Sequence, residues 1–428
     1  MKNDIVTLKC VDITVDFYGV CKHEGLVVFV KGMIPDEVAG VKIINIKNRI
    51  AFGIIDKLIT PSKYRIKEMC PIAYKCGGCD LQHIDYNYQL ILKKRLIENI
   101  FRNAKLDVDV KDVVSSKDIL AYRNKIQVPV SNNKIGYYRN HSNDIVEFNN
   151  CFISSELTNS VLNDIKKYIF SNNISNNVRH VVIREASSGL MVCLVVNDIN
   201  NIDNDNFVNY LLSKYNSIKS IMLNVNNKDT NVIFGDEDIV IYGEDYIVDK
   251  CNDISFAIPL RSFYQVNSSQ MSVLYDLAIE NGELNSNDCV LDLFCGIGSI
   301  SIYISKFVHR VLGIEIVDKS IEYAKKNKEL NNISNVDFVL SDANKVNDFI
   351  KDYNTIIVDP PRKGINKELI NSIVENSIDK VIYISCNQST LARDLNFLKE
   401  YYDIVSCQPV DMFPQTKHIE SVTVLKRK

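Results

Sequence analysis

The chain has 428 residues, of which 46% are hydrophobic and 24% are charged. This composition excludes a disordered chain, and the length predicts two or three domains with room for a full α/β core. The 50 basic and 53 acidic residues give a formal charge of -3, which neither predicts nor excludes nucleic-acid binding because local patches matter more than totals.

No apolar stretch is long enough to cross a bilayer, and the N-terminus lacks the apolar block of a signal peptide. We therefore expect a cytoplasmic protein with no membrane partner and no obligatory protein partner. The 12 cysteines are too few for a disulfide scaffold. In a reducing compartment the clustered ones are better explained as metal ligands or nucleophiles, and most of the others as core residues.

Short apolar alternation with turn signals fills the first sixty residues, at 11–15, 25–30, 37–44 and 50–55. Such regularly spaced strands predict a small barrel, of which the oligonucleotide-binding fold is one type. Pro61-Ser62 indicates a boundary, so residues 1–60 are expected to form the first domain.

Residues 84–104 carry apolar side chains at helical spacing, with the basic run 93–95 on the other side. This pattern predicts an amphipathic helix whose basic side is solvated, and which can pack on the C-terminal domain. From residue 120 to about 259 the pattern returns to strands separated by Asn-rich loops. We expect residues 61–260 to form a central mixed α/β domain.

From residue 268 onward helices alternate with strands. Helices are predicted at 271–281, 300–307 and 319–330, and strands at 289–293, 310–314, 336–340, 355–358 and 381–384, before a last strand pair. This alternation predicts a Rossmann-like, doubly wound parallel sheet across residues 261–428.

A glycine-containing turn follows the first strand of this sheet and opens a helix. Its glycines, Gly296 among them, let the backbone approach a ligand. Glu315 ends the next strand, where an acid can accept both hydroxyls of a ribose. Asp292 heads the turn, where a pyrophosphate would avoid negative charge, so a cationic ligand such as S-adenosylmethionine is favoured, with Asp342 placed to meet the adenine amine. A dinucleotide-binding redox domain is the alternative.

Cys386 follows the strand at 381–384, where open α/β sheets place reacting groups. A thiolate that adds to C6 of a pyrimidine makes C5 able to attack a methyl sulfonium, and a base later removes the C5 proton. We expect donors at the strand tip or the next helix start to lower the pKa of this thiol. An inert core cysteine is the alternative.

Several longer segments carry a resemblance to a known family: 263–267 (Phe-Tyr-Gln-Val-Asn), 292–296 (Asp-Leu-Phe-Cys-Gly), 359–364 (Asp-Pro-Pro-Arg-Lys-Gly), 385–387 (Ser-Cys-Asn) with 390–395 (Thr-Leu-Ala-Arg-Asp-Leu), and 411–420 (Asp-Met-Phe-Pro-Gln-Thr-Lys-His-Ile-Glu). Together they resemble the S-adenosylmethionine-dependent RNA (uracil-5-)-methyltransferases, in that family's order.

The resemblance implies roles for particular residues. Cys386 would be the nucleophile and Glu420 the base that takes the C5 proton. The pocket for cofactor and target base would be lined by Gln265, Phe294, Glu315 and Asp359, with Asp359 serving the uracil as much as the cofactor. Otherwise Asp359 is a loop acid made rigid by two prolines, and Glu420 a charged residue entering the last strand.

Arg362 follows Asp-Pro-Pro, where enzymes that methylate exocyclic amines typically carry an aromatic residue. This difference favours methylation at carbon.

Three cysteines, Cys70, Cys76 and Cys79, lie in one short loop with two glycines. Cys151 is the fourth candidate, because its surroundings resemble the iron-sulfur subset of the family. Four thiolates suit a [4Fe-4S] cluster, which would be structural or RNA-positioning, and zinc is the alternative.

The N-terminal barrel resembles a TRAM domain, an RNA-binding module, although 18–21 lacks the second glycine often found there. Residues 122–125 and 136–139 interleave aromatic with basic side chains, as a surface that stacks unpaired nucleotides would, or they simply form strand faces. The target uracil must be unpaired or flipped out to expose its C6 face.

We therefore expect an enzyme that forms 5-methyluridine in RNA. 23S ribosomal RNA is favoured over transfer RNA, because the transfer-RNA branch commonly lacks both the barrel and the cysteine cluster. A non-catalytic RNA-binding assembly factor is the remaining alternative, and the intact Cys386 and Glu420 argue against it.

Overall fold

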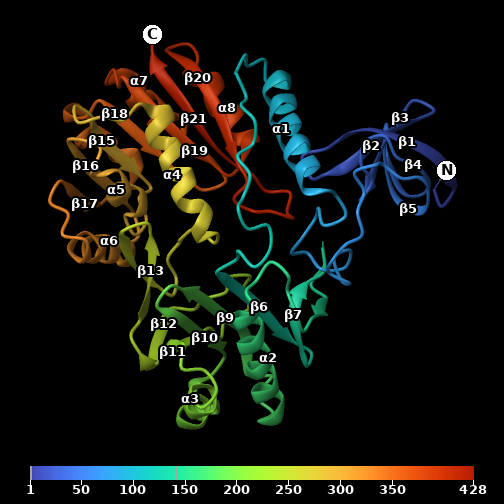
Figure 1. Ribbon diagram of the computed structural model, residues 1–428, viewed down its shortest axis with the longest axis horizontal. Coiled ribbons are helices and arrows are strands. Elements are labelled where there is room, and N and C mark those ends of the chain that lie inside the picture. The colour runs from blue at the N-terminus through green and yellow to red at the C-terminus, as the bar shows by residue number, and fades with distance from the viewer. Residues whose placement is uncertain (1, 141) are drawn as a thin grey trace.

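The computed structural model describes residues 2–140 and 142–428. Figure 1 shows three parts that follow one another along the chain: a barrel that projects to one side, a central sheet, and a C-terminal sheet with helices on both faces. Among the described residues, no helix combines the length and the apolar character needed to cross a membrane.

The N-terminal part is a closed five-stranded barrel, which confirms the predicted architecture. Its strands follow the order β1-β2-β3-β5-β4, and β1 closes the barrel by pairing with β4. The strand expected at 11–15 starts earlier and ends at Ile13, because the chain turns at Phe17, whose φ is 57°, and a strand that was not predicted follows. The strands are β1 (Ile5–Ile13), β2 (Tyr18–His23), β3 (Leu26–Lys31), β4 (Val38–Lys47) and β5 (Ile50–Thr60).

Helix α1 (Tyr86–Asn103) lies between the barrel and the C-terminal sheet (Figure 1). Leu92 and Leu96 pack with the barrel, whereas Ile97 and Phe101 belong to the core of the C-terminal sheet. The predicted helix and its packing are confirmed. The predicted solvation is wrong for Lys93, which is completely buried, because a further side of the helix faces the loop that precedes the last strand.

The central part is a seven-stranded sheet of order β12-β11-β10-β9-β6-β7-β8. Two helices that were not predicted pack on one face of it. Helix α2 begins after the N-cap Ser155, and its apolar residues recur at helical spacing, but the many asparagines around it favoured an interpretation as loops. The elements are β6 (Lys125–Ser131), β7 (Lys134–Tyr138), β8 (Ile145–Glu147), α2 (Glu156–Ser171), β9 (Val178–Ala186), β10 (Gly189–Val196), α3 (Asn204–Leu212), β11 (Ile218–Val225) and β12 (Glu237–Gly243).

A hairpin of β13 (Tyr246–Cys251) and β14 (Ile254–Pro259) joins the central part to the C-terminal part. Phe256 and Ile258 share a core with the C-terminal helices. The Asn327 side chain bonds both the backbone N–H and the carbonyl of Ala257, at 2.7 and 3.3 Å. The hairpin thus packs with the C-terminal sheet, although it precedes residue 261.

The C-terminal part is the predicted doubly wound sheet, of order β17-β16-β15-β18-β19-β21-β20. Its first five strands are parallel, and β21 runs antiparallel between β19 and β20. The elements are α4 (Ser268–Gly282), β15 (Cys289–Leu293), α5 (Ser299–Ile304), β16 (Arg310–Glu315), α6 (Asp318–Leu330), β17 (Val336–Leu340), β18 (Thr355–Val358), α7 (Lys367–Glu375), β19 (Lys380–Ser385), α8 (Gln388–Leu398), β20 (Tyr402–Val410) and β21 (Glu420–Arg427).

Successive side chains of each strand point to opposite faces of the sheet, so alternate residues belong to two separate cores, one on each face. Val290 packs with α4, α5 and α6, whereas its neighbour Leu291 packs with α7, α8 and α1. Because α1 covers part of this sheet, residues from the first quarter of the chain complete the C-terminal fold. Both faces are covered, so ligands can reach the sheet only at the ends of its strands.

Candidate active site

A cleft of about 1900 Å³ opens at the carboxyl ends of the C-terminal strands and continues to the cysteine loop. Twelve of the thirteen expected site residues line it: Gln265, Phe294, Gly296, Glu315, Asp342, Asp359, Cys386, Glu420, Cys70, Cys76, Cys79 and Cys151. The thirteenth, Asp292, does not.

The turn after β15 forms one wall of the cleft. Gly296 has a φ of 56°, and a Cβ added there would meet no atom within 4 Å, so the backbone is open to a ligand. Its N–H donates to Glu315 Oε2 at 3.1 Å, while Glu315 Oε1 accepts from the N–H groups of Ile316 and Val317 at 2.8 and 2.9 Å. These bonds hold the Glu315 carboxylate at the rim. Phe294 has a φ of 69°, an uncommon conformation for a bulky residue that is often found at functional sites.

The two remaining acids of this wall differ in position. Asp292 is fully buried beneath the turn, where it accepts a hydrogen bond from Ser301 Oγ, and burial raises its pKa to about 7. Asp292 is therefore tied to α5, the helix that follows the turn. Asp342 follows β17 and lines the cleft, with one oxygen accepting from the Asn344 N–H at 2.9 Å.

The antiparallel pairing of β21 with β19 brings Cys386 and Glu420 together. Ser385 pairs with Ser421, and one further step of the same register sets Cys386 beside Glu420. Gln388 fixes this end of the ladder, because its side-chain amide donates to Ser385 O at 3.1 Å and to Ile419 O at 3.3 Å. The nucleophile and base expected from the sequence thus face one cleft from neighbouring strands.

Burial raises the pKa of three acidic groups at this point. Burial, and then the charges of Glu420 and Asp359, raise the pKa of Cys386 from 9.0 to about 11. Burial raises the pKa of Asp359 to about 7, and burial together with Asp359 raises that of Glu420 well above its usual value. The expected lowering of the thiol pKa is therefore wrong for the protein without ligands, because burial and then the charges of Glu420 and Asp359 outweigh the opposing effects of Arg362 and of the backbone donor at Cys386.

Arg362 is the nearby cation, and its charge lowers the pKa of both Cys386 and Glu420. Its carbonyl accepts from Asn387 Nδ2 at 3.0 Å and from Thr390 Oγ1 at 3.1 Å, so the loop that carries it is tied to the start of α8. The sequence placed Arg362 in a motif but not in the site. Its place three residues after Asp359 in the Asp-Pro-Pro-Arg motif is the signal that could have found it.

Gln265 enters the cleft from the segment before α4. Its side chain is only 3% exposed, and its Oε1 has no hydrogen-bond partner within the protein. A buried amide oxygen without a partner is costly, so a ligand donor in the cleft is needed to satisfy it. Phe263, two residues earlier, is 69% exposed at the same cleft.

The four candidate metal ligands lie in the far part of the cleft. Burial raises the pKa of Cys76 to about 11 and that of Cys79 to about 12, and Cys151 contributes to both shifts. The cysteine loop is therefore close to Cys151, although Cys151 follows Cys79 by 72 residues in the sequence. Within residues 2–140 and 142–428, no three His, Cys, Asp or Glu side chains are close enough together to hold one metal ion.

The aromatic residues expected to stack nucleotides are mostly used within the protein. Tyr122 is buried and its hydroxyl donates to Pro414 O at 2.9 Å, and Tyr137 stacks on Phe148 with ring centroids 4.9 Å apart. Tyr138 is 43% exposed and, with Arg139, lines the cleft. The stacking surface is thus narrower than predicted.

Comparisons with known proteins agree with this geometry. The family described as tRNA (Uracil-5-)-methyltransferase matches residues 85–428. An uncharacterized RNA methyltransferase of Bacillus cereus is 39% identical, over 99% of this chain and 97% of that protein, and one of Clostridium tetani is 36% identical, over 95% and 93%. The crystal structure of Pyrococcus abyssi tRNA (uracil-54, C5)-methyltransferase in complex with S-adenosyl-L-homocysteine has a TM-score of 0.79 and 28% identity, covering 98% of this chain and 99% of that one.

A doubly wound sheet with a cleft at the carboxyl ends of its strands is the arrangement in which open α/β proteins bind nucleotide-like ligands. Within that class, the chain belongs to the family of S-adenosylmethionine-dependent RNA (uracil-5-)-methyltransferases.

The raised pKa of Cys386 leads to a test on the protein alone. A thiol with a pKa of about 11 holds about 100-fold less thiolate at pH 8 than one with the ordinary value. We expect iodoacetamide to alkylate Cys386 in cofactor-free protein at a rate that climbs with pH up to about 11, measured by mass spectrometry of the peptide and referred to N-acetylcysteine. An alkylation rate that stops rising by about pH 8.5 would contradict the raised pKa of Cys386.

Proposed function

We propose that this protein methylates C5 of a specific uridine in RNA through a covalent bond between Cys386 and C6 of the uracil. The observation that carries the proposal is the convergence of Cys386, Glu420 and Asp359 on the cleft that also holds the glycine turn and Glu315. A nucleophile and a base that can both reach one ring are what addition followed by elimination requires.

The chemistry follows from the positions of these side chains. The Cys386 sulfur adds to C6, and the electron pair released into the ring makes C5 able to take up a methyl group. Glu420 then removes the proton from C5, the C5–C6 double bond re-forms, and the sulfur leaves C6 as a thiolate. S-adenosylmethionine, when bound, supplies the methyl group on a positively charged sulfur.

The first step requires that Cys386 lose its proton. Since burial and the neighbouring carboxyl groups keep the thiol neutral in the free protein, activation must come with the ligands. Asp359, with a pKa of about 7, exchanges protons near neutrality. Arg362 favours the thiolate, and a cationic cofactor in the cleft acts in the same direction. Activation on binding protects the thiol from side reactions between turnovers.

The wall of the cleft supports binding of S-adenosylmethionine. The open backbone at Gly296, the fixed carboxylate of Glu315 and the unpartnered amide oxygen of Gln265 supply contacts for a nucleoside and its polar tail. In this assignment Glu315 meets the ribose and Asp342 the adenine amine. Asp292 does not line the cleft and bonds to Ser301 of α5, which gives it an indirect role.

The favoured substrate is 23S ribosomal RNA. We assign the five-stranded barrel as a TRAM domain, but it does not discriminate between the two RNAs, because the structure of the Pyrococcus abyssi tRNA methyltransferase matches 98% of this chain. The four cysteines favour the ribosomal branch of the family. Transfer RNA is the second candidate, because the Pyrococcus abyssi relative acts on uracil-54 of tRNA and the matching family is described by tRNA.

We also assign the four cysteines as ligands of a [4Fe-4S] cluster, although no three of these residues, all of which the structure describes, lie close enough together to hold one metal ion. Cys70, Cys76, Cys79 and Cys151 all line one part of the cleft, and an all-thiolate donor set suits iron-sulfur chemistry or zinc. These residues would hold the cluster beside the exposed Tyr138 and Arg139, where it would order the RNA-binding side of the cleft.

Two substitutions separate the roles of nucleophile and base. We expect Cys386→Ala to abolish both methylation and the covalent complex with RNA that contains 5-fluorouridine. Glu420→Gln should slow turnover about 10²- to 10⁴-fold and accumulate protein attached to ordinary RNA on denaturing gels, because the adduct forms but cannot resolve. Cys289→Ala, which changes a cysteine outside the cleft, is the matched control. Full activity of Cys386→Ala would refute the mechanism.

Mapping of 5-methyluridine in RNA from a deletion strain tests the substrate. We expect the modification to disappear from one or more positions of 23S ribosomal RNA, to remain in transfer RNA, and to return with the wild-type gene but not with Cys386→Ala. Loss confined to transfer RNA would establish the second candidate instead.

Metal analysis tests the cysteine site. Protein purified without oxygen should be brown and contain about four irons per chain, and Cys79→Ser should lose both the colour and the iron, while Cys289→Ser keeps them. Colourless protein with stoichiometric zinc would favour zinc.

A further inference from the structure

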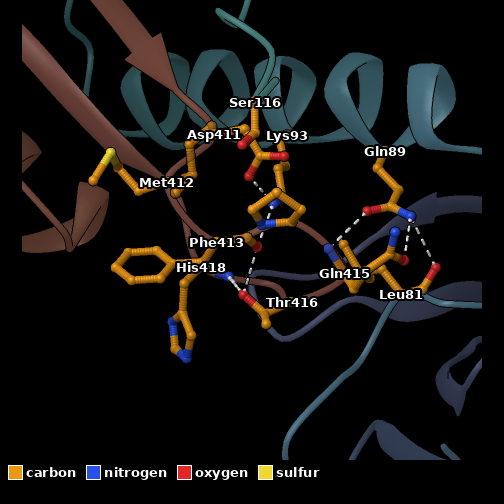
Figure 2. A network of polar contacts seen from close by, with 12 residues as sticks. Leu81, Gln89, Lys93, Ser116, Asp411, Met412, Phe413, Gln415, Thr416 and His418 are labelled. Atoms are coloured by element: carbon orange, nitrogen blue, oxygen red, sulfur yellow. Dashed lines mark hydrogen bonds and ion pairs between the residues drawn. The ribbon is translucent and has the colours of Figure 1, made fainter. Parts of the chain in front are cut away.

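The loop between β20 and β21 (residues 411–419) carries Glu420 at its end, and it is held almost entirely by residues outside the C-terminal sheet. Figure 2 shows the network around it. Phe413, Thr416 and His418 of this loop line the cleft, so the loop shapes the site as well as delivering the proposed base.

Successive backbone groups of the loop are each bonded to a different part of the chain. Asn267 Nδ2 donates to Met412 O at 3.2 Å, and the Tyr122 hydroxyl to Pro414 O at 2.9 Å. The N–H groups of Asp80 and Leu81 both donate to Gln415 O at 3.0 Å. The loop therefore takes its shape from the central part and from the segment beside the cysteine loop.

Helix α1 supplies the strongest of these bonds. Lys93 Nζ lies 2.7 Å from Asp411 Oδ1, and both side chains have 0% exposure. The same Nζ donates to Phe413 O at 3.3 Å. One turn earlier, Gln89 accepts from the Gln415 N–H at 3.3 Å and donates to Gln415 Oε1 at 3.1 Å. Figure 2 shows Gln89 and Lys93 pointing from the helix onto the loop.

The other oxygen of Asp411 is also used. It accepts from the Tyr86 hydroxyl at 3.0 Å, and that hydroxyl in turn accepts from the Ser116 N–H at 2.8 Å. A buried ion pair contributes little net stability, because desolvation of the two charges offsets their attraction. Its geometry, however, is tightly specified, since either charge left alone in the interior is costly.

We propose that the Lys93–Asp411 pair is a positioning device, which holds the 411–419 loop in the one conformation that sets Glu420 against the target ring. This inference rests on the proposed function, in which Glu420 removes the C5 proton. Cys386 does not depend on the loop to the same degree, because it is fixed by β19 and by the cap of α8, where Asn387 Oδ1 accepts from the Ser389 N–H at 3.1 Å.

Because Glu420 depends on the 411–419 loop more than Cys386 does, loosening the loop is expected to affect mainly one step of the reaction. A looser loop should impair removal of the C5 proton and leave attack by Cys386 nearly unchanged. A general loss of folding would impair both steps equally. This difference separates positioning from a structural role.

The experiment compares the wild-type protein with Lys93→Met and with Lys93→Met/Asp411→Asn, in which no isolated charge is left in the interior. We expect covalent capture of 5-fluorouridine RNA, which needs Cys386 but not Glu420, to keep its rate within about threefold, while resolution of the adduct on ordinary RNA slows about 10- to 100-fold. Adduct should accumulate on denaturing gels. Lys94→Met is the matched control, because this neighbouring lysine pairs with Asp112 at a surface.

A second measurement needs no RNA. Hydrogen exchange followed by mass spectrometry should show faster exchange of the 411–419 amides in the double variant, with the 386–398 amides unchanged. Equal losses in both reaction steps, unchanged adduct resolution, or unchanged exchange would each overturn the proposal. A wild-type protein that forms no adduct would instead refute the proposed chemistry, and the exchange data would still decide whether the pair holds the loop.

Discussion

The pairing of β21 with β19 is the constraint on which the site depends. β21 runs antiparallel in a sheet whose first five strands are parallel, so its first residue lies at the same edge as the last residues of β19. Cys386 and Glu420 meet there because their strands point in opposite directions. A slip of one residue would turn every side chain of β21 to the other face, and would move the Glu420 carboxyl group away from Cys386.

Register alone does not complete the site, because Glu420 follows a loop that has few partners in its own sheet. Helix α1 packs on the C-terminal sheet and covers part of it, and Lys93 of the same helix forms an ion pair with Asp411. Barrel, cysteine loop and sheet are thereby joined through a single segment. Since Asp80 and Leu81, which follow the cysteine loop, also bond to Gln415, the cysteine end of the cleft is connected to the loop that carries Glu420.

Most of the C-terminal fold could be predicted because buried parallel strands appear as short apolar runs between helices, as at Cys289–Leu293. The site residues followed from motifs at the ends of those strands. Helix α2 was missed because asparagines obscured its apolar spacing. Lys93 was assigned to solvent, although Gln89 and Ile97 stand four residues to either side and mark its side of the helix as covered. The pKa of Cys386 depends on carboxyl groups distant in sequence, so no local pattern could reveal it.

The dependence of the loop on α1 limits how such enzymes can diversify. New RNA preferences could arise by recombining the barrel or the central sheet with the catalytic sheet of a relative. A crossover placed between residues 93 and 411 would take these two residues from different parents. The hybrid could then contain one buried charge without its partner. Exchange is therefore expected to preserve Lys93 and Asp411 as a unit, and lineages that lost one should have lost the other.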